Sequence, residues 1–188
     1  MSKVDLLGHF GLRDTGEKDE ANEAPFSVAE LPTGWTVLWS NDQTFAKIEI
    51  CTSLSLKAPV LSCWVNETIM FSSVNYFDRG NYLWFVGHDA QRGMNNLESD
   101  GDLPDQFSSI RDSLVAQQAA AGGEDADVDF IFDIPLELAQ SICGFKHDLC
   151  DFEWGAPAFS VADTADLLEQ NDEVKAKSGW LNRLFGKN

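Results

Sequence analysis

Residues 74–86 read VNYFDRGNYLWFV, and this stretch decides the fold of the chain. Two runs rich in aromatic and β-branched residues, 74–77 and 82–86, flank the short polar segment 78–81. Strand-forming residues on both sides of a short loop that contains glycine are typical of a β-hairpin. We therefore expect two antiparallel strands joined by a tight turn at residues 78–81.

Further strand-like runs lie before this hairpin. Residues 34–39 favour a strand, residues 45–56 alternate in polarity, and residues 60–71 are rich in β-formers. We predict an antiparallel meander of about four or five strands over residues 34–88, with one further strand near 127–132. A turn centred on Lys57 would place Cys51 and Cys63 opposite each other in this meander.

The second half of the chain favours helices. Phe107, Ile110 and Leu114 recur at helical spacing after Pro104, and the glycine pair at 122–123 ends the pattern. A shorter helix is expected over residues 135–143. The predicted fold class is therefore α+β, an antiparallel sheet meander with helices packed mainly on one face.

The composition predicts a simple domain organisation. We expect a loosely structured acidic leader over residues 1–30, a single α+β domain over 31–162, and a helical tail over 163–188 with a basic amphipathic end. No stretch of the sequence is typical of a secretory signal or a membrane span. We therefore expect a cytoplasmic protein with reduced cysteines and no integral membrane segment.

The net charge narrows the class of partner. The chain has 188 residues, with 31 acidic side chains against 13 Lys and Arg and a formal net charge of −18. Phosphate would repel such a chain, so we expect no nucleic-acid partner. Residues 101–150 alone hold ten acids and two bases. This local excess predicts an anionic surface that attracts a basic protein.

One acidic run is the first candidate binding site. It lies around the predicted strand near residues 127–132, where carboxylates would form a solvent-facing edge. The Asp-x-Asp-x-Asp start of a calcium loop occurs here, but Phe130 and Leu136 stand where that loop needs Gly and Glu. We predict contacts with a basic protein partner from Glu124, Asp125, Asp127, Asp129 and Asp133.

The end of the chain is the second candidate binding site. Residues 175–188 carry four basic side chains and no acid, and their apolar residues are spaced as on one helical face. Such a segment could dock into a partner's groove or onto an acidic membrane surface, or fold back on the acidic body, or fray. The residues predicted to make contact are Trp180, Leu181, Arg183, Leu184 and Phe185.

Histidines and cysteines provide the alternatives to a binding protein, namely an enzyme or a zinc site. His88 and His147 each precede an aspartate, so a small hydrolase-type enzyme could use either one with neighbouring carboxylates. Cys143 and Cys150 bracket His147, but a zinc site would need a fourth ligand from Cys51 or Cys63. The sequence lacks phosphate-loop, dinucleotide-binding and nucleophile-elbow motifs. We therefore assign no catalytic residue, metal or cofactor, and expect a non-catalytic binding protein rather than an enzyme.

The chain also shows two resemblances to known groups of proteins. The similarity is carried by residues 80–89, 128–135 and 144–148, together with Leu97, Gly101, Leu103 and Pro104. Through them, residues 30–150 resemble a group of small, acidic, uncharacterised bacterial cytosolic proteins, which implies a lineage but no activity. In size, acidity and α+β character the chain is also similar to bacterial immunity proteins, which neutralise basic toxins. An immunity-, inhibitor- or adaptor-like role is therefore what the resemblance implies. The likeness to immunity proteins is one of type and not of motif.

Overall fold

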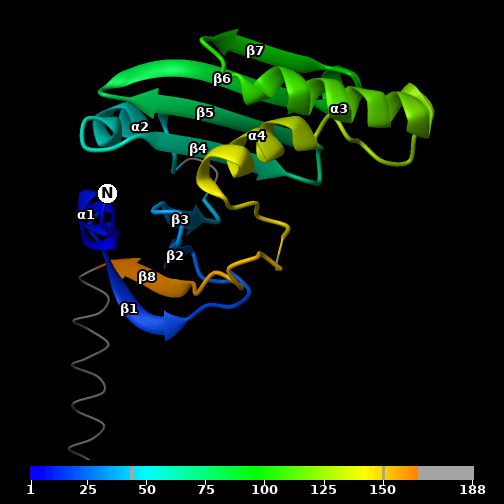
Figure 1. Ribbon diagram of the computed structural model, residues 1–188. Helices are drawn as coiled ribbons and strands as arrows, with labels where there is room; N and C mark the ends of the chain where they lie inside the picture. The colour runs from blue at the N-terminus through cyan, green and yellow to red at the C-terminus, as the bar shows by residue number, and fades with distance from the viewer. Residues whose placement is uncertain (43–44, 150, 165–188) are drawn as a thin grey trace, which may run out of the picture. The chain divides into compact units, whose positions relative to one another are not determined.

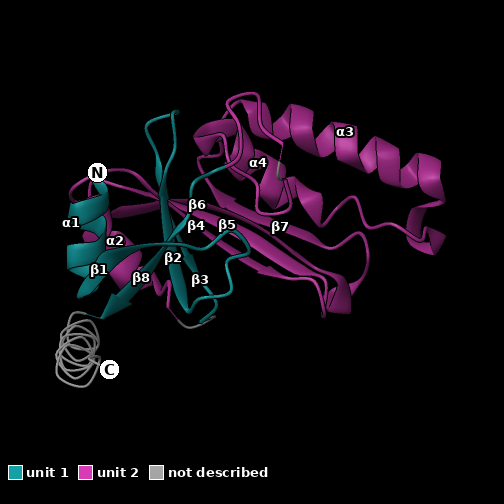
Figure 2. Cartoon of the chain, turned by 90° about the horizontal axis from the view of Figure 1, so that it is seen from below, with its two compact units in different colours: residues 1–42, 157–188 teal, residues 43–156 magenta. Residues whose placement is uncertain are grey.

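The computed structural model describes residues 1–42, 45–149 and 151–164 (Figure 1). The α+β class is confirmed, because helices accompany two four-stranded antiparallel sheets. The chain forms two compact units, Met1–Asp42 with Pro157–Asn188 and Gln43–Ala156 (Figure 2). This division differs from the expected leader, single domain and tail, since residues 157–164 belong with residues 1–42.

The first unit is built around a sheet with the strand order β1-β8-β2-β3. It begins with a short helix, α1, whose first turn is capped by Ser2: the Ser2 hydroxyl accepts the backbone N–H of Asp5 at 3.2 Å. The elements of this unit are α1 (Lys3–His9), β1 (Leu12–Lys18), β2 (Phe26–Glu30), β3 (Thr36–Ser40) and β8 (Ser160–Thr164).

The prediction of a loosely structured leader needs correction. Leu7, Leu12 and Val28 are buried and form a small core with Ala162 of β8. Residues 12–14 pair with residues 162–164, so the leader is ordered by a strand from far along the chain. No local pattern in residues 1–30 indicates that pairing. The predicted tail residues 165–188 lie outside the described residues.

The second unit contains a sheet with the strand order β4-β5-β6-β7. Its centre is the expected hairpin: Asp78 pairs with Asn81, and Arg79 and Gly80 form the two-residue turn. Both turn residues have positive φ, 50° and 76°, as a type I′ turn requires, so the hairpin prediction is confirmed. The strands are β4 (Val60–Asn66), β5 (Phe71–Asp78), β6 (Asn81–Asp89) and β7 (Leu97–Gly101).

The predicted meander over residues 34–88 is wrong in its first half. Residues 36–40 form β3 of the other sheet, and Ile48–Ser55 form the helix α2 instead of a strand. Cys51, Leu54 and Ser55 are the buried residues of α2, which is the spacing of one helical face. Cys51 therefore lies on a helix and does not face Cys63 across a hairpin.

Two helices, α3 (Gln106–Ala121) and α4 (Asp133–Cys143), lie over one face of the second sheet (Figure 1). Short 3₁₀ turns at Ala90–Arg92 (η1) and Gly123–Asp125 (η2) precede β7 and follow α3. Side chains from both helices and from β5 and β6 form the main core. Its buried members are Val74, Trp84, Val86, Phe107, Leu114, Ile131, Ile134, Leu138 and Ala139.

The predicted strand near 127–132 is also wrong. The Asp129 carboxylate accepts the backbone N–H groups of Ile131 and Phe132, each at 3.1 Å. A side chain that takes these donors bends the chain into a turn and removes them from a strand ladder. The turn leads into α4. Among the described residues no helix combines the length and apolar composition needed to cross a membrane.

Candidate functional site

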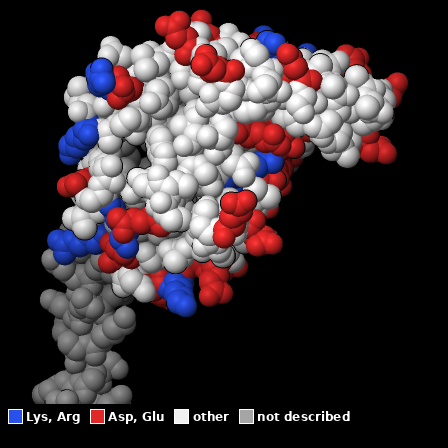
Figure 3. Space-filling view, in the orientation of Figure 1, with Lys and Arg blue, Asp and Glu red and all other residues white. Residues whose placement is uncertain are grey.

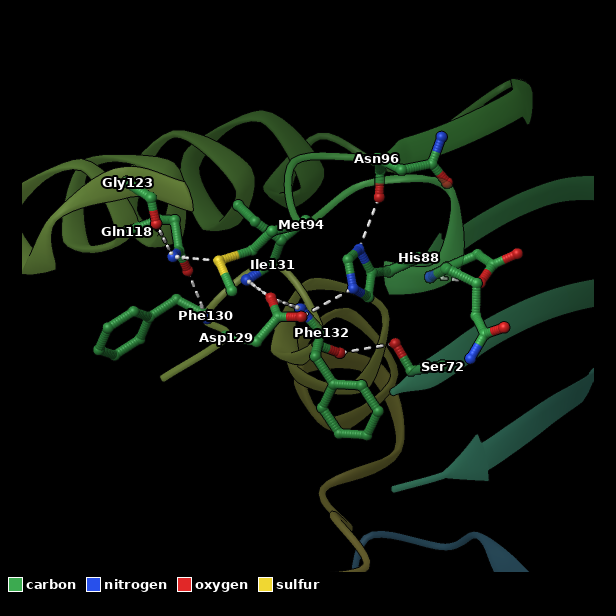
Figure 4. A network of polar contacts seen from close by, with 12 residues as sticks. Ser72, His88, Met94, Asn96, Gln118, Gly123, Asp129, Phe130, Ile131 and Phe132 are labelled. Atoms are coloured by element: carbon green, nitrogen blue, oxygen red, sulfur yellow. Dashed lines mark hydrogen bonds and ion pairs between the residues drawn. The ribbon is translucent and has the colours of Figure 1, made fainter. Parts of the chain in front are cut away.

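A buried polar network surrounds His88 on β6 (Figure 4). His88 follows Trp84 and Val86 with the period of two that keeps side chains on one face of a strand, here the face covered by α3 and α4. Its side chain is 0% exposed. Nδ1 lies 2.6 Å from the carbonyl oxygen of Asn96, and Nε2 lies 2.9 Å from Asp129 Oδ2.

The protons of this pair follow from its partners. A backbone carbonyl carries no proton, so Nδ1 of His88 donates to Asn96. One further proton lies between Nε2 and Asp129: either the ring carries it and faces a carboxylate, or the carboxyl group carries it and donates to the ring. In both forms the pair has no net charge, which makes its burial tolerable.

Asp129 joins two parts of the second unit. One of its carboxyl oxygens faces His88 on β6, while the other accepts the N–H groups that start the turn before α4. The Ser72 hydroxyl on β5 adds a third tie, because it donates to the carbonyl oxygen of Phe132 at 2.6 Å. The segment before α4 is therefore fixed to the two central strands of the sheet.

Gln118 of α3 holds the start of the segment that runs from the end of this helix to Asp129. The side chain is buried, since the residue is 1% exposed. Its amide nitrogen donates to the carbonyl oxygen of Gly123 at 2.6 Å, and the same nitrogen lies 3.2 Å from the sulfur of Met94. Its amide oxygen accepts the N–H of Phe130 at 2.7 Å. Gln118 thus fastens residues 123–130 to the C-terminal end of the helix.

Sequence reasoning missed Gln118, although a signal was present. Phe107, Ile110, Leu114 and Gln118 continue one helical stripe, and a polar residue on an apolar stripe indicates a buried hydrogen-bonding role. Asn96 carried no such signal, because it takes part only through its backbone carbonyl. Two glycines with positive φ, Gly122 and Gly123, turn the chain from the helix into the loop.

The structure divides the five predicted acidic residues into two groups. Glu124, Asp125 and Asp127 are exposed on the loop that Gln118 and Asp129 hold at its ends. Asp129 is buried against His88, and Asp133 forms an ion pair with Lys146 at 2.8 Å. Three carboxylates therefore face solvent, and we call residues 122–128 the acidic loop.

Bases are scarce around the acidic loop. Residues 90–129 contain nine acidic side chains and two basic side chains, Arg92, which pairs with Glu98, and Arg111. Arg111 Nη2 lies 2.8 Å from Asp112 Oδ1, so its charge is already compensated. Acidic side chains outnumber basic ones around the outer end of α3 in the face shown by Figure 3. The loop therefore lies in a region of negative potential.

A hollow of about 330 Å³ opens beside the acidic loop. Four of its seven lining residues are apolar, and neither His88 nor Asp129 lines it. It lies between α3, the loop before β7, and the residues that follow the helix. The lining residues are Asn95, Leu97, Val115, Gln118, Ala119, Gly123 and Ile131.

His147 lies in a different polar cluster from His88. Its Nε2 is 3.4 Å from Glu67 Oε1, and Nδ1 is 3.9 Å from Asp148 Oδ1. Its neighbour Lys146 bridges Asp133 and Asp148. Burial alone would lower the pKa of Lys146, but the hydrogen bond and charge of the Asp133 carboxylate, with Asp148, outweigh burial and raise that pKa.

The cysteines occupy separate environments. Burial raises the pKa of the Cys51 thiol, and it likewise raises the pKa of the Cys143 thiol at the end of α4. Within the described part of the chain, no group of three or more His, Cys, Asp or Glu side chains is arranged to hold a metal ion. Cys150 and the predicted tail contacts Trp180, Leu181, Arg183, Leu184 and Phe185 lie outside that part.

Comparison of the chain with protein-family models finds no match. Comparison with curated proteins finds no similar sequence, and comparison with solved structures finds no similar fold. The features that bear on function are therefore the acidic loop, the buried network that holds it and the adjoining hollow.

Proposed function

We propose that this chain is a non-catalytic binding protein that captures a basic protein partner through the acidic loop. The observation that carries the proposal is the arrangement of Glu124, Asp125 and Asp127. All three carboxylates are exposed, and the loop that bears them is tied at both ends to buried side chains. An immunity-, inhibitor- or adaptor-like role in a bacterial cytoplasm is the biological setting that this proposal favours.

A fixed acidic loop suits this role for two physical reasons. Its negative potential draws a positively charged partner and raises the rate of encounter. Because hydrogen bonds from Gln118 and the contacts of Asp129 already order the loop, less conformational entropy is lost when a partner binds. Salt would weaken the encounter, since exposed charges are screened over about 8 Å at physiological ionic strength.

The geometry gives the hydrolase alternative less support. A general base must reach a substrate or a water molecule, and the side chain of His88 is fully buried with both ring nitrogens engaged. His147 is paired with acidic side chains in another cluster, and it does not line the hollow beside the acidic loop. The role of His88 is therefore to position the loop.

The test uses the full-length chain as bait in a lysate of the source cells, followed by binding measurements with the purified partner. In the test variant, Glu124→Gln, Asp125→Asn and Asp127→Asn are combined. We expect an affinity loss of about tenfold or more at low salt, because about 1.4 kcal/mol corresponds to a factor of ten. The loss should shrink as ionic strength rises.

The matched control removes the same number of charges elsewhere. Glu17, Glu20 and Glu30 are exposed acids of the first unit, and changing all three to Gln alters the net charge equally. The control should retain the affinity of the unaltered chain. Equal losses of affinity in both variants would show that only net charge matters. A partner that binds both variants as tightly as the unaltered chain would overturn the proposal.

A further inference from the structure

We infer that the hollow beside the acidic loop receives one apolar side chain of the basic partner, from a segment in which Lys or Arg flanks that side chain. The inference rests on the proposed function and names the chemistry of the partner segment. The hollow would anchor the segment, and the acidic loop would contact its charges.

The walls of the hollow select an apolar group. Leu97, Val115, Ala119 and Ile131 contribute only apolar side-chain atoms. The amide of Gln118 already bonds to Gly123 and Phe130. A polar ligand would therefore lose hydrogen bonds to water on entering, whereas an apolar group would be stabilised by leaving water.

The second wall amide is also engaged. Asn95 Nδ2 donates to the carboxylate of Glu124 at 3.0 Å. This bond links the lining of the hollow directly to the acidic loop, so the two features belong to one surface. It also places one negative charge next to a residue that lines the opening. A cation on the occupant would be favoured there, and an anion would be repelled.

Exposed apolar side chains extend this surface. Val115 lines the hollow and is 45% exposed, and Val128 follows Asp127 on the acidic loop and is 54% exposed. An apolar centre with charged groups at its margin is the usual anatomy of a protein-binding site. Isolated exposed valines need no explanation, but here Val115 lines the hollow and Val128 directly follows Asp127 in the acidic loop.

The size of the hollow fits an anchor rather than a whole ligand. Its volume of about 330 Å³ is at the lower end of the range for small-molecule sites, which is about 300–1,000 Å³. Such sites also present a few unengaged polar groups to orient the ligand. Here both wall amides form internal bonds and the charges lie outside the hollow, so the occupant is a basic peptide segment.

The experiment is a peptide-display selection against the full-length chain, with random twelve-residue peptides as the probe. Enriched peptides should contain an aliphatic or aromatic residue with at least two Lys or Arg within about three positions of it. A synthetic version with that residue changed to Ser should bind about tenfold more weakly. Enrichment of basic peptides without an apolar residue, of neutral apolar peptides, or of no peptide would overturn the inference.

A matched pair of variants then locates the anchor. Ala119→Trp places a large side chain at the hollow, whereas Ala120→Trp makes the same change at the next exposed position of α3, which does not line it. We expect Ala119→Trp to lower the affinity of an enriched peptide about tenfold and Ala120→Trp to leave it unchanged. If Ala119→Trp fails to fold, Val115→Gln replaces it, with Ala116→Gln as control.

The two proposals fail in different ways. If the triple acidic-loop variant weakens binding of the native partner but Ala119→Trp does not, electrostatic capture stands and the anchor is wrong. If Ala119→Trp weakens binding but the triple variant does not, the hollow binds an apolar group without the proposed charge contacts. If neither variant changes the affinity, both proposals are wrong.

Discussion

His88 Nε2 and Asp129 Oδ2 lie 2.9 Å apart, although the two residues are 41 positions apart in the chain. The contact joins strand β6 to the turn before α4, and it also fixes the C-terminal end of the acidic loop. A buried group thus determines where exposed carboxylates are presented. The stability of the second unit and the geometry of the proposed binding surface therefore depend on the same pair.

Removing the Asp129 carboxylate should destabilise the second unit strongly. Asp129→Ala leaves His88 without its partner and removes the acceptor of two backbone N–H groups. We expect a loss of about 3–5 kcal/mol in the free energy of unfolding, measured by urea denaturation. Asp127→Ala, on the exposed part of the loop, should stay within about 0.5 kcal/mol. Similar losses in the two variants would contradict a structural role for the pair.

The position of the first proton on His88 can be observed directly. Because the carbonyl of Asn96 only accepts, Nδ1 should carry a proton at neutral pH. ¹⁵N-edited NMR of the histidine side chains should show a protonated Nδ1 for His88. An unprotonated Nδ1 would mean that the contact with Asn96 is not a hydrogen bond.

Gln118 should contribute to stability and to the order of the loop. Gln118→Leu leaves the N–H of Phe130 and the carbonyl of Gly123 without their side-chain partner. We expect a loss of about 2 kcal/mol and faster hydrogen exchange at the Phe130 amide. Gln117→Leu is the control, because Gln117 is exposed at the adjacent position. Unchanged exchange in Gln118→Leu would show that other contacts order the loop.

Acid should weaken the first unit through Asp19. The Ser27 hydroxyl donates to this buried carboxylate and lowers its pKa, burial opposes that shift, and the N–H groups of Ala24 and Glu23 add to the lowering. A carboxyl group with a lowered pKa stabilises the folded state above its unfolded pKa, near 3.8, and this stabilisation is lost as the pH falls through the folded value.

Asp19→Asn should therefore reduce stability at neutral pH and make the unfolding of this unit less dependent on pH below about 4. Thermal unfolding measured from pH 2 to pH 7 would show both effects. Glu20→Gln is the control, because the neighbouring Glu20 is exposed. A slope in Asp19→Asn equal to that of the unaltered chain would assign the acid sensitivity to other groups.

Local turn chemistry explains what could be predicted of the fold. The hairpin at residues 78–81 was predictable because a short polar segment separates two strand-forming runs and contains Gly80, which adopts a positive φ without strain. The start and end of α3 were signalled by Pro104 and the glycine pair in the same way. These features depend on neighbouring residues, so the sequence contains all the information they need.

Elements that depend on distant partners could not be predicted. The pairing of Leu12 with Thr164 orders the leader, and no pattern in either segment identifies the other. Residues 45–56 show alternation and helical spacing together, and packing against β4, β5 and β6 decides for the helix. Residues 128–132 also alternate, but the N–H groups of Ile131 and Phe132 donate to the Asp129 carboxylate, and these hydrogen bonds make the segment a turn.

The candidate site was likewise predictable only where it does not depend on distant partners. The exposure of Glu124, Asp125 and Asp127 agrees with the prediction of an acidic surface, because uncompensated charges remain in water. The inward positions of Asp129 and Asp133 depend on His88 and Lys146, which lie on other segments. Composition predicts that an acidic surface exists, and tertiary contacts decide which carboxylates form it.

The place of β8 has a consequence for how the polypeptide is made. β8 lies between β1 and β2, yet its residues are synthesised after all of residues 43–156. A nascent chain on the ribosome can thus complete the second unit while β1 still lacks its neighbour. Only after Thr164 has emerged can the first sheet close, so the earliest residues to be translated are among the last to reach their final pairing.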